Sequence, residues 1–75
     1  MKIVTLPYRY SLLIEWDPRS DVFVVTVPEL PGCRTHGKSY EEAIAQAQDA
    51  IEGWLDAQAA LGRPIPQPRQ FAAAS

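Results

Sequence analysis

The chain has 75 residues, with seven Lys and Arg against nine Asp and Glu, and its formal net charge is -2 at pH 7. No basic run is long enough to follow a phosphate backbone, so the charge disfavours direct nucleic-acid binding. Hydrophobic residues make up 47% and charged residues 21%, a balance typical of a folded globular domain and not of a disordered chain.

The short length limits how the fold can be stabilised. A single domain of this size buries only about 60% of the surface that its unfolded chain exposes, so we expect self-association as a homodimer or higher oligomer. Cys33 is the only cysteine and His36 the only histidine. The composition therefore excludes an intramolecular disulfide and disfavours a closed zinc site.

The N-terminal sequence predicts neither a secretory signal nor a membrane anchor. MKIVTLPYRY lacks the apolar length and the small-residue cleavage site of a signal peptide. No stretch of the chain approaches the roughly 18 apolar residues of a membrane span. We therefore expect a cytoplasmic protein without membrane contact.

The first predicted element is a half-buried strand over residues 8–16. Its residues alternate between an apolar side and a mostly polar side. The apolar side holds Tyr8, Tyr10, Leu12, Ile14 and Trp16, and Glu15 lies on the other side. The next four residues, 17–20, combine an Asp with a Pro and predict a hairpin loop.

A second strand is predicted over residues 21–27, DVFVVTV. Both of its faces are apolar, which predicts the central position in a sheet. Pro28 ends it because a proline cannot donate to a strand ladder. Pro31 and Gly32 then turn the chain into a short third strand over 33–36, closed by Gly37.

One helix is predicted from about Tyr40 to Leu61. Ser39 and Glu42 form a capping box, in which the Ser39 hydroxyl accepts from the Glu42 N–H and the Glu42 carboxylate reaches back to Ser39. Gly62 is placed for the left-handed residue after the helix, and Pro64 prevents continuation. The predicted apolar stripe is Tyr40, Ile44, Ala47, Ile51, Trp54, Gln58 and Leu61, flanked by Ala43, Ala50 and Leu55.

The tail after the helix, RPIPQPRQFAAAS, has prolines at alternate positions. This predicts an extended segment around Ile65, where a short C-terminal strand is an option, and a frayed end over 69–75. The whole chain, 1–75, is thus predicted to be one α+β domain with its core at about 8–68. Its expected architecture is a three-stranded antiparallel sheet in the order β-β-β-α, packed on one helix.

Four acidic residues are candidate metal ligands, because carboxylate oxygens suit Mg²⁺. Local roles explain them better: Asp17 and Asp21 bracket the predicted turn, Glu15 lies on the solvated side of a strand, and Glu29 lies in a loop. We therefore expect no metal and no cofactor. The remaining charge on these residues suits contact with a basic partner.

Two further pairs favour structural roles over chemistry. Cys33 and His36 point to opposite faces of a strand, so a thiolate–histidine pair is not expected. Tyr40 and Trp54 are better explained as core residues at helical spacing than as a ligand slot. The feature that small size itself motivates is a docking surface for another protein, because three strands and one helix leave a sheet edge and part of the sheet uncovered.

An ordered set of short motifs spans about residues 8–68. The motifs are VPELPGCRTHG at 27–37, SYEEA at 39–43 and GRPIP at 62–66. Together they resemble the N-terminal domain of HicB-like antitoxins. The positions that carry the resemblance are Pro28, Leu30, Pro31, Gly32, Gly37, Ser39, Glu42, Ala43, Gly62 and Pro64.

The resemblance implies a partial ribonuclease-H-like fold that binds and silences a small HicA-type toxin, an enzyme that cleaves messenger RNA. It implies no catalysis by this chain, since ribonuclease H chemistry needs several carboxylates converging on two metal ions. Full-length members commonly carry a C-terminal DNA-binding module, and the chain given stops at Ser75 without one, so direct DNA binding is not expected.

From charge alone, the expected contacts to the toxin are Glu15, Asp17, Asp21 and Glu29. Ile65, in the proline-spaced tail, is the expected contact to a neighbouring copy. The alternative to the antitoxin is an orphan regulatory or ligand-binding domain of the same fold with no toxin partner.

Overall fold

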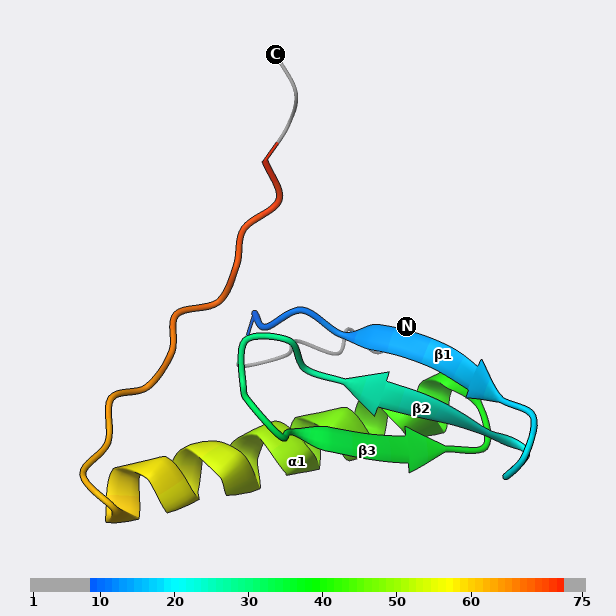
Figure 1. The fold of residues 1–75 in the computed structure, drawn as a ribbon, viewed down its shortest axis with the longest axis horizontal. Coiled ribbons are helices and arrows are strands. Elements are labelled where there is room, and N and C mark those ends of the chain that lie inside the picture. The colour runs from blue at the N-terminus through cyan, green and yellow to red at the C-terminus, as the bar shows by residue number, and fades with distance from the viewer. Residues whose placement is uncertain (1–8, 73–75) are drawn as a thin grey trace, which may run out of the picture.

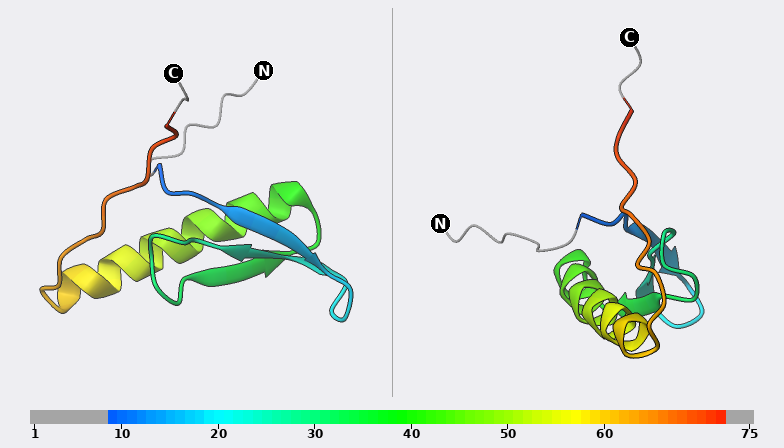
Figure 2. Two further views of the ribbon diagram at one scale, coloured as in Figure 1. Left: turned by 45° about the horizontal axis from the view of Figure 1, so that its top comes forward. Right: turned by 90° about the vertical axis from the view of Figure 1, so that its left-hand side faces the viewer.

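The computed structural model describes residues 9–72 of the chain. Its elements are β1 (Leu13–Asp17), β2 (Val22–Thr26), β3 (Arg34–Gly37) and α1 (Tyr40–Ala60). The strands form one antiparallel sheet in the order β1-β2-β3. The helix lies along one side of this sheet (Figures 1 and 2). The predicted α+β architecture and the central position of the second strand are confirmed.

β1 is shorter at its start than predicted. Tyr8, the first residue of the predicted strand, lies outside the described residues, and residues 9–12 form no strand. The register pairs Leu13 with Thr26, so Ser11 would face Pro28, which has no N–H to donate. The N–H of Val27 is also committed elsewhere, because it donates to the Cys33 carbonyl at 3.0 Å. β1 therefore begins where β2 stops offering partners.

The two faces of β2 have different surroundings. Val25 and the residue after the strand, Val27, are 0% and 1% exposed and pack towards the helix. Val22, Val24 and Thr26 alternate with them and remain half-buried. Period-two alternation thus assigns the odd-numbered residues to the core and the even-numbered ones to the other face.

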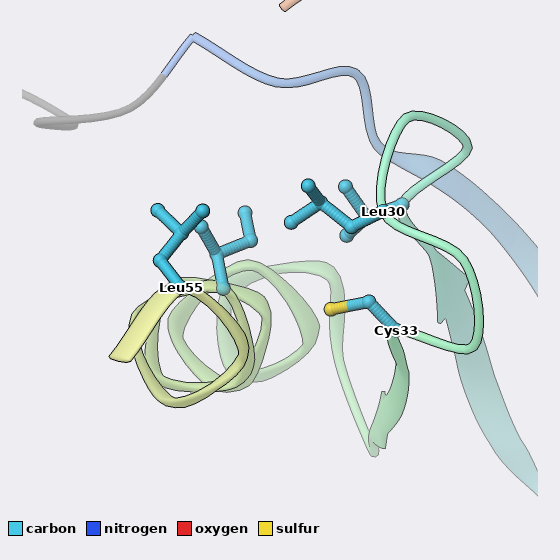
Figure 3. Packing of buried hydrophobic residues seen from close by; sticks show 5 residues of the cluster. Leu30, Cys33 and Leu55 are labelled. Atoms are coloured by element: carbon cyan, nitrogen blue, oxygen red, sulfur yellow. The ribbon is translucent and has the colours of Figure 1, made fainter. Parts of the chain in front are cut away.

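The loop between β2 and β3 supplies much of the core. Leu30 is 1% exposed and Cys33 is 5% exposed, and both pack with Ile51 and Leu55 of the helix. Figure 3 shows the side chains of Leu30 and Cys33 directed from the loop towards Leu55. Gly32 adopts φ 78°, a left-handed conformation that glycine reaches without a Cβ clash. The turn therefore folds the loop back over the C-terminal half of the helix.

Both ends of α1 lie close to their predicted positions. The Ser39 hydroxyl accepts from the Glu42 N–H at 3.1 Å, and the Glu42 carboxylate accepts from the Lys38 N–H at 3.0 Å. The second contact reaches one residue further back than a capping box predicts. At the other end Gly62 has φ 67°, with N–H bonds from Gly62 to Ala59 and from Arg63 to Gln58, which is a Schellman motif.

The buried row of the helix differs from the predicted stripe. The predicted ends of the stripe, Tyr40 and Leu61, are 61% and 62% exposed, so the prediction was wrong there. The helix instead buries residues spaced by four, which drift around its axis as it crosses the sheet. These residues are Ala43, Ala47, Ile51 and Leu55.

The tail leaves the end of the helix as an extended segment and runs back past the N-terminal segment (Figure 2). The optional strand near Ile65 is not formed, since residues 63–72 carry no strand. Prolines at 64, 66 and 68 remove the N–H groups that a ladder needs. Of the end predicted to fray, residues 73–75 lie outside the described part, and Arg69 is hydrogen-bonded to Glu29.

We predict opposite effects from the same substitution at two glycines. A Cβ on Gly37 would overlap the backbone nitrogen of Ala43, whereas a Cβ on Gly53 meets nothing within 4 Å. Gly37→Ala should lower the free energy of unfolding by about 1–3 kcal/mol through overpacking. Gly53→Ala should raise it by about 1 kcal/mol through helix propensity. Urea unfolding measures both, and equal effects would contradict the close contact.

Candidate functional site

One face of the sheet has no element packed on it within the described residues, and we call it the open face. The strand register places every second side chain of each of the three strands on this face. The open face consists of Leu13, Glu15 and Asp17 from β1, Val22, Val24 and Thr26 from β2, and Arg34 and His36 from β3. It is therefore apolar along its middle strand and charged along both outer strands.

Part of the open face is hollowed. A hollow of about 480 Å³ has Val22 and Val24 at its apolar floor, with an acidic residue on the β1 side and basic residues on the β3 side. Its lining is Asp17, Ser20, Val22, Val24, Arg34, Thr35 and His36. A broad, shallow surface with apolar centre and charged rim has the anatomy of a protein interface more than that of a site that encloses a small molecule.

The structure does not bring the four predicted acidic residues together. Glu15 and Asp17 lie on the open face, and Asp21 lies at the hairpin with φ 54°. Glu29 follows the opposite end of β2. Among the described residues, no three His, Cys, Asp or Glu side chains are grouped so that they could hold a metal ion. The Asp17 carboxylate accepts from the Arg19 N–H at 2.9 Å, which is the local turn role predicted for it.

Glu29 joins three segments of the chain. Its carboxylate accepts from the Ser11 N–H at 3.0 Å, from the Ser11 hydroxyl at 3.0 Å and from the Arg69 N–H at 2.9 Å. We call this set the Glu29 node. The sequence predicts that Glu29 lies in a loop and contacts a partner. The separations of 18 and 40 residues along the chain left no local pattern that would have revealed the node.

Hydrogen bonding lowers the pKa of the carboxyl at the Glu29 node. Partial burial alone would raise the pKa of the Glu29 carboxyl, but the N–H groups of Arg69 and Ser11 outweigh it and hold the pKa below its ordinary value. The ionised carboxylate accepts all of these bonds. Glu29 therefore anchors the tail as an anion.

The tail has a second anchor next to Ile65. The Tyr10 hydroxyl donates to the Pro66 carbonyl at 2.6 Å, and Arg69 is held by Glu29. Ile65 itself is 46% exposed. The tail is thus attached to its own domain just beyond the residue predicted to contact a neighbouring copy.

The two pairs considered for chemistry have structural surroundings. Cys33 is buried, which raises the pKa of its thiol, whereas His36 lies on the open face. Tyr40 and Trp54 are separated by fourteen positions, or about 21 Å along the helix axis, so they form no slot. The Trp54 indole donates to the Pro31 carbonyl at 3.0 Å, and the Tyr40 ring stacks on Phe23 at a centroid distance of 4.3 Å.

The structure also reveals an aromatic cluster that the sequence did not predict. Trp16 meets Phe23 edge-on at 5.0 Å, and Phe23 stacks on Tyr40. Trp16 remains 51% exposed and Tyr40 61% exposed. The hairpin register pairs Trp16 with Phe23, so a register predicted from the hairpin would have indicated the Trp16–Phe23 contact but not the Phe23–Tyr40 contact. Large, partly exposed rings of this kind are common in protein contacts.

The residues of the shared motifs build the scaffold on which these surfaces sit. Pro28 follows β2, Leu30 enters the core, and the Pro31 carbonyl holds Trp54. Gly32 and Gly62 take left-handed conformations, Gly37 admits the backbone of Ala43, and Ser39 and Glu42 cap the helix. Pro64 lies in the extended tail. No helix in the described part of the chain is long and apolar enough to cross a membrane.

Comparisons with known proteins point to one family. The family model described as the HicB-like antitoxin of a bacterial toxin-antitoxin system matches residues 10–75. A UPF0150 protein of Archaeoglobus fulgidus is 40% identical over 48 residues, which cover 64% of this chain and 68% of that protein. One of Thermoplasma acidophilum is 34% identical over 59 residues, which cover 79% and 84%.

Among solved structures, the N-terminal domain of the Burkholderia pseudomallei antitoxin HicB is similar to this chain. The TM-score is 0.63 at 26% sequence identity, and the match covers 85% of this chain and 69% of that one. The shared arrangement is three antiparallel strands followed by one helix.

The Glu29 node predicts a pH-dependent attachment of the tail. Because the folded-state pKa of Glu29 is lowered, its stabilising effect is full above the unfolded-state pKa and is lost as the pH falls through the folded-state pKa. Glu29→Gln should lower the protection factors of the Ser11 and Arg69 amides at neutral pH, towards the values that the parent reaches only in acid, where Glu29 is protonated. Hydrogen exchange measured by NMR tests this, with the exposed Glu52→Gln as the control. Unchanged exchange in Glu29→Gln would contradict the node.

Proposed function

The chain belongs to the HicB-like antitoxin family of bacterial toxin-antitoxin systems, and we propose that it binds and neutralises a small HicA-type mRNA interferase by protein–protein contact. Its action is steric: it covers the partner's RNA-binding and catalytic surface and performs no reaction itself. The proposed setting is the cytoplasm. Promoter DNA is not a proposed ligand of this domain, whose net charge is -2.

The observation that supports the proposal most is the open face. Val22, Val24 and Thr26 form a half-buried row on the central strand, although no element covers them within residues 9–72. Half-exposed β-branched residues at the centre of a sheet favour occupation by another polypeptide, because a partner removes their remaining apolar surface from water. We propose that the toxin sits on this face.

We propose that the acidic residues near the open face attract a basic toxin through charge complementarity. Glu15 and Asp17 border the open face and Asp21 lies at its hairpin end. An RNA-binding toxin presents basic side chains, and opposite charges at the rim raise the association rate. Glu29 keeps its place among the proposed partner contacts, but the Glu29 node already occupies its carboxylate, so its contribution is the smallest of the four.

Self-association is also part of the proposal. Ile65 is half exposed in the tail and is one proposed contact between copies. It is a weak candidate for such a contact, because Pro66 and Arg69 beyond it are held within the same chain.

An orphan regulatory or ligand-binding domain is the alternative function, and the hollow on the open face is the observation that favours it. Co-expression with the adjacent gene followed by pull-down separates the two functions.

Val24→Lys should weaken toxin binding by roughly tenfold or more, since it places a charge at the apolar centre of the interface. The loss should lie mainly in the dissociation rate. Surface plasmon resonance with the co-purified toxin measures it. Gln46→Lys on the exposed side of the helix is the control and should bind like the parent. If Val24→Lys keeps full affinity while its unfolding midpoint is unchanged, the toxin does not use the open face.

Neutralising two acidic residues should slow association. Asp17→Asn with Asp21→Asn keeps a side-chain carbonyl for the Arg19 N–H and a residue that tolerates positive φ, but removes two charges. The association rate with the toxin should fall several-fold at low salt, and salt should abolish the difference. Asp49→Asn with Asp56→Asn removes the same charge from the exposed side of the helix. Equal effects of the two pairs would leave only net charge as the cause.

A further inference from the structure

The hydrogen-bond pattern of the sheet shows which residues of β1 direct their backbone N–H and C=O groups to its outer edge. The Val27 N–H donates to Cys33 at the end of the β2–β3 ladder, so the odd-numbered residues of β2 direct their backbone groups to β3. The even-numbered residues Val22, Val24 and Thr26 therefore bond to β1. Their partners are Asp17, Glu15 and Leu13. The backbone groups of Ile14 and Trp16 consequently point away from the sheet, along its outer edge.

The two outer edges of the sheet differ in chemistry. β3 has four residues, and the two that direct their backbone groups outwards are Arg34 and His36. β1 has five residues, and apolar side chains are exposed on both of its faces, with Leu13 at 49% and Trp16 at 51%. It contains no Lys or Pro, the residues that most often guard a free edge. β1 is thus the edge suited to pairing with another strand.

The helix leaves room beside this edge. α1 packs mainly against β3 and β2, so the core-side residues of β1 are covered least. Ile14 packs against the core cluster of Val25, Ala43 and Ala47 but is only half-buried. Trp16 contacts Phe23 but is still half exposed. A further strand next to β1 would complete the burial of both residues.

We propose that β1 pairs antiparallel with β1 of a second copy of this chain, about a two-fold axis at Ile14. In this register Ile14 faces Ile14 of the other copy and Trp16 faces Leu12 of the other copy. Ile14 and Trp16 have outward backbone groups, so both pairs are hydrogen-bonded when the pairing extends the strand of each copy by one residue, to Leu12. Glu15 faces Leu13 of the other copy on the open face.

Charge and a proline disfavour the two registers centred further along β1. An axis at Glu15, the middle of β1, would place two Glu15 carboxylates in a non-hydrogen-bonded pair, the closest kind. An axis at Trp16 would set Glu15 against Asp17 and Ile14 against Pro18, which has no N–H. The axis at Ile14 avoids like charges and uses the outward groups of Ile14 and Trp16. The strand is therefore complementary to itself, which favours a second copy as its occupant.

The pairing yields one continuous sheet of six strands. A two-fold axis between antiparallel strands stands perpendicular to the sheet, so both helices lie on one side and both open faces lie on the other. The inference does not rest on the proposed toxin, since it concerns the edge and not the face. It differs from a contact through Ile65, because a chain that ends at Gly62 keeps all of β1.

The test compares one substitution at the two edges. Ile14→Pro removes an outward N–H of β1, and His36→Pro removes an outward N–H of β3, while both spare the bonds to β2. Sedimentation of the free protein should show the parent and the His36→Pro variant at twice the 8.3 kDa monomer mass, and the chain ending at Gly62 at twice its own smaller monomer mass. Ile14→Pro should sediment as a monomer. A monomeric parent, or a dimer lost through His36→Pro or through the truncation, would overturn the proposal.

Cross-linking tests the register even if Ile14→Pro does not fold. Leu13→Cys and Glu15→Cys both lie on the exposed open face, while the native Cys33 is buried. Mixing the two variants under mild oxidation should give a disulfide-linked heterodimer, because opposed Cα atoms at about 4.5 Å suit a disulfide. Glu15→Cys alone should not cross-link. Efficient self-cross-linking of Glu15→Cys would move the axis to Glu15 and refute the register.

Discussion

The close approach of α1 to β3 at Gly37 is the constraint on which the rest of the structure depends. Gly37 has no side chain, and the backbone of Ala43 occupies the space where a Cβ would lie. Ala43 and Ala47 follow as the first two members of the buried row, both 0% exposed. Small residues on both elements let the helix lie directly on the sheet at this end, and the larger Ile51 and Leu55 meet the loop residues at the other. The helix is therefore fixed under β3 and β2.

This placement leaves one face and one edge of the sheet for other molecules. A single helix covers one side of three strands, so the open face keeps an apolar middle row between charged outer strands. The helix also lies away from β1, which leaves Trp16 and Leu13 partly exposed. In a chain of this length, burial of such surface by other polypeptides adds the stability that its own small core lacks. Binding and stability are thus expected to be linked.

The Glu29 node shows how a small domain fixes segments that have no place in its sheet. Ser11 precedes β1 and Arg69 follows the helix by several residues, yet one carboxylate accepts from both. The node lies at the end of the sheet away from the hairpin. The domain thereby separates two functions of its acidic residues: Glu29 holds the chain, while Glu15, Asp17 and Asp21 border the surface proposed for the partner.

Short-range signals were sufficient for several features. The helix limits follow from Ser39, Glu42 and Gly62, whose effects act within four residues along the chain. Likewise β2 was assigned from its β-branched run and from Pro28, and the ordered motifs led to the family. The acidic residues at the hairpin were correctly given turn roles, as Asp17 shows. Each of these signals depends on a residue and its near neighbours.

Contacts between distant segments decided the remainder. The start of β1 depends on Val27 and Pro28, which follow β2. The buried row of the helix depends on the close contact between Gly37 and the backbone of Ala43. The role of Glu29 depends on Ser11 and Arg69, which are 18 and 40 positions away. The sequence by itself thus determined the order and type of the elements, the limits of the helix and the family. Only the tertiary structure decided which face and which edge of the sheet stay uncovered among residues 9–72, because those properties depend on what lies opposite each residue in space.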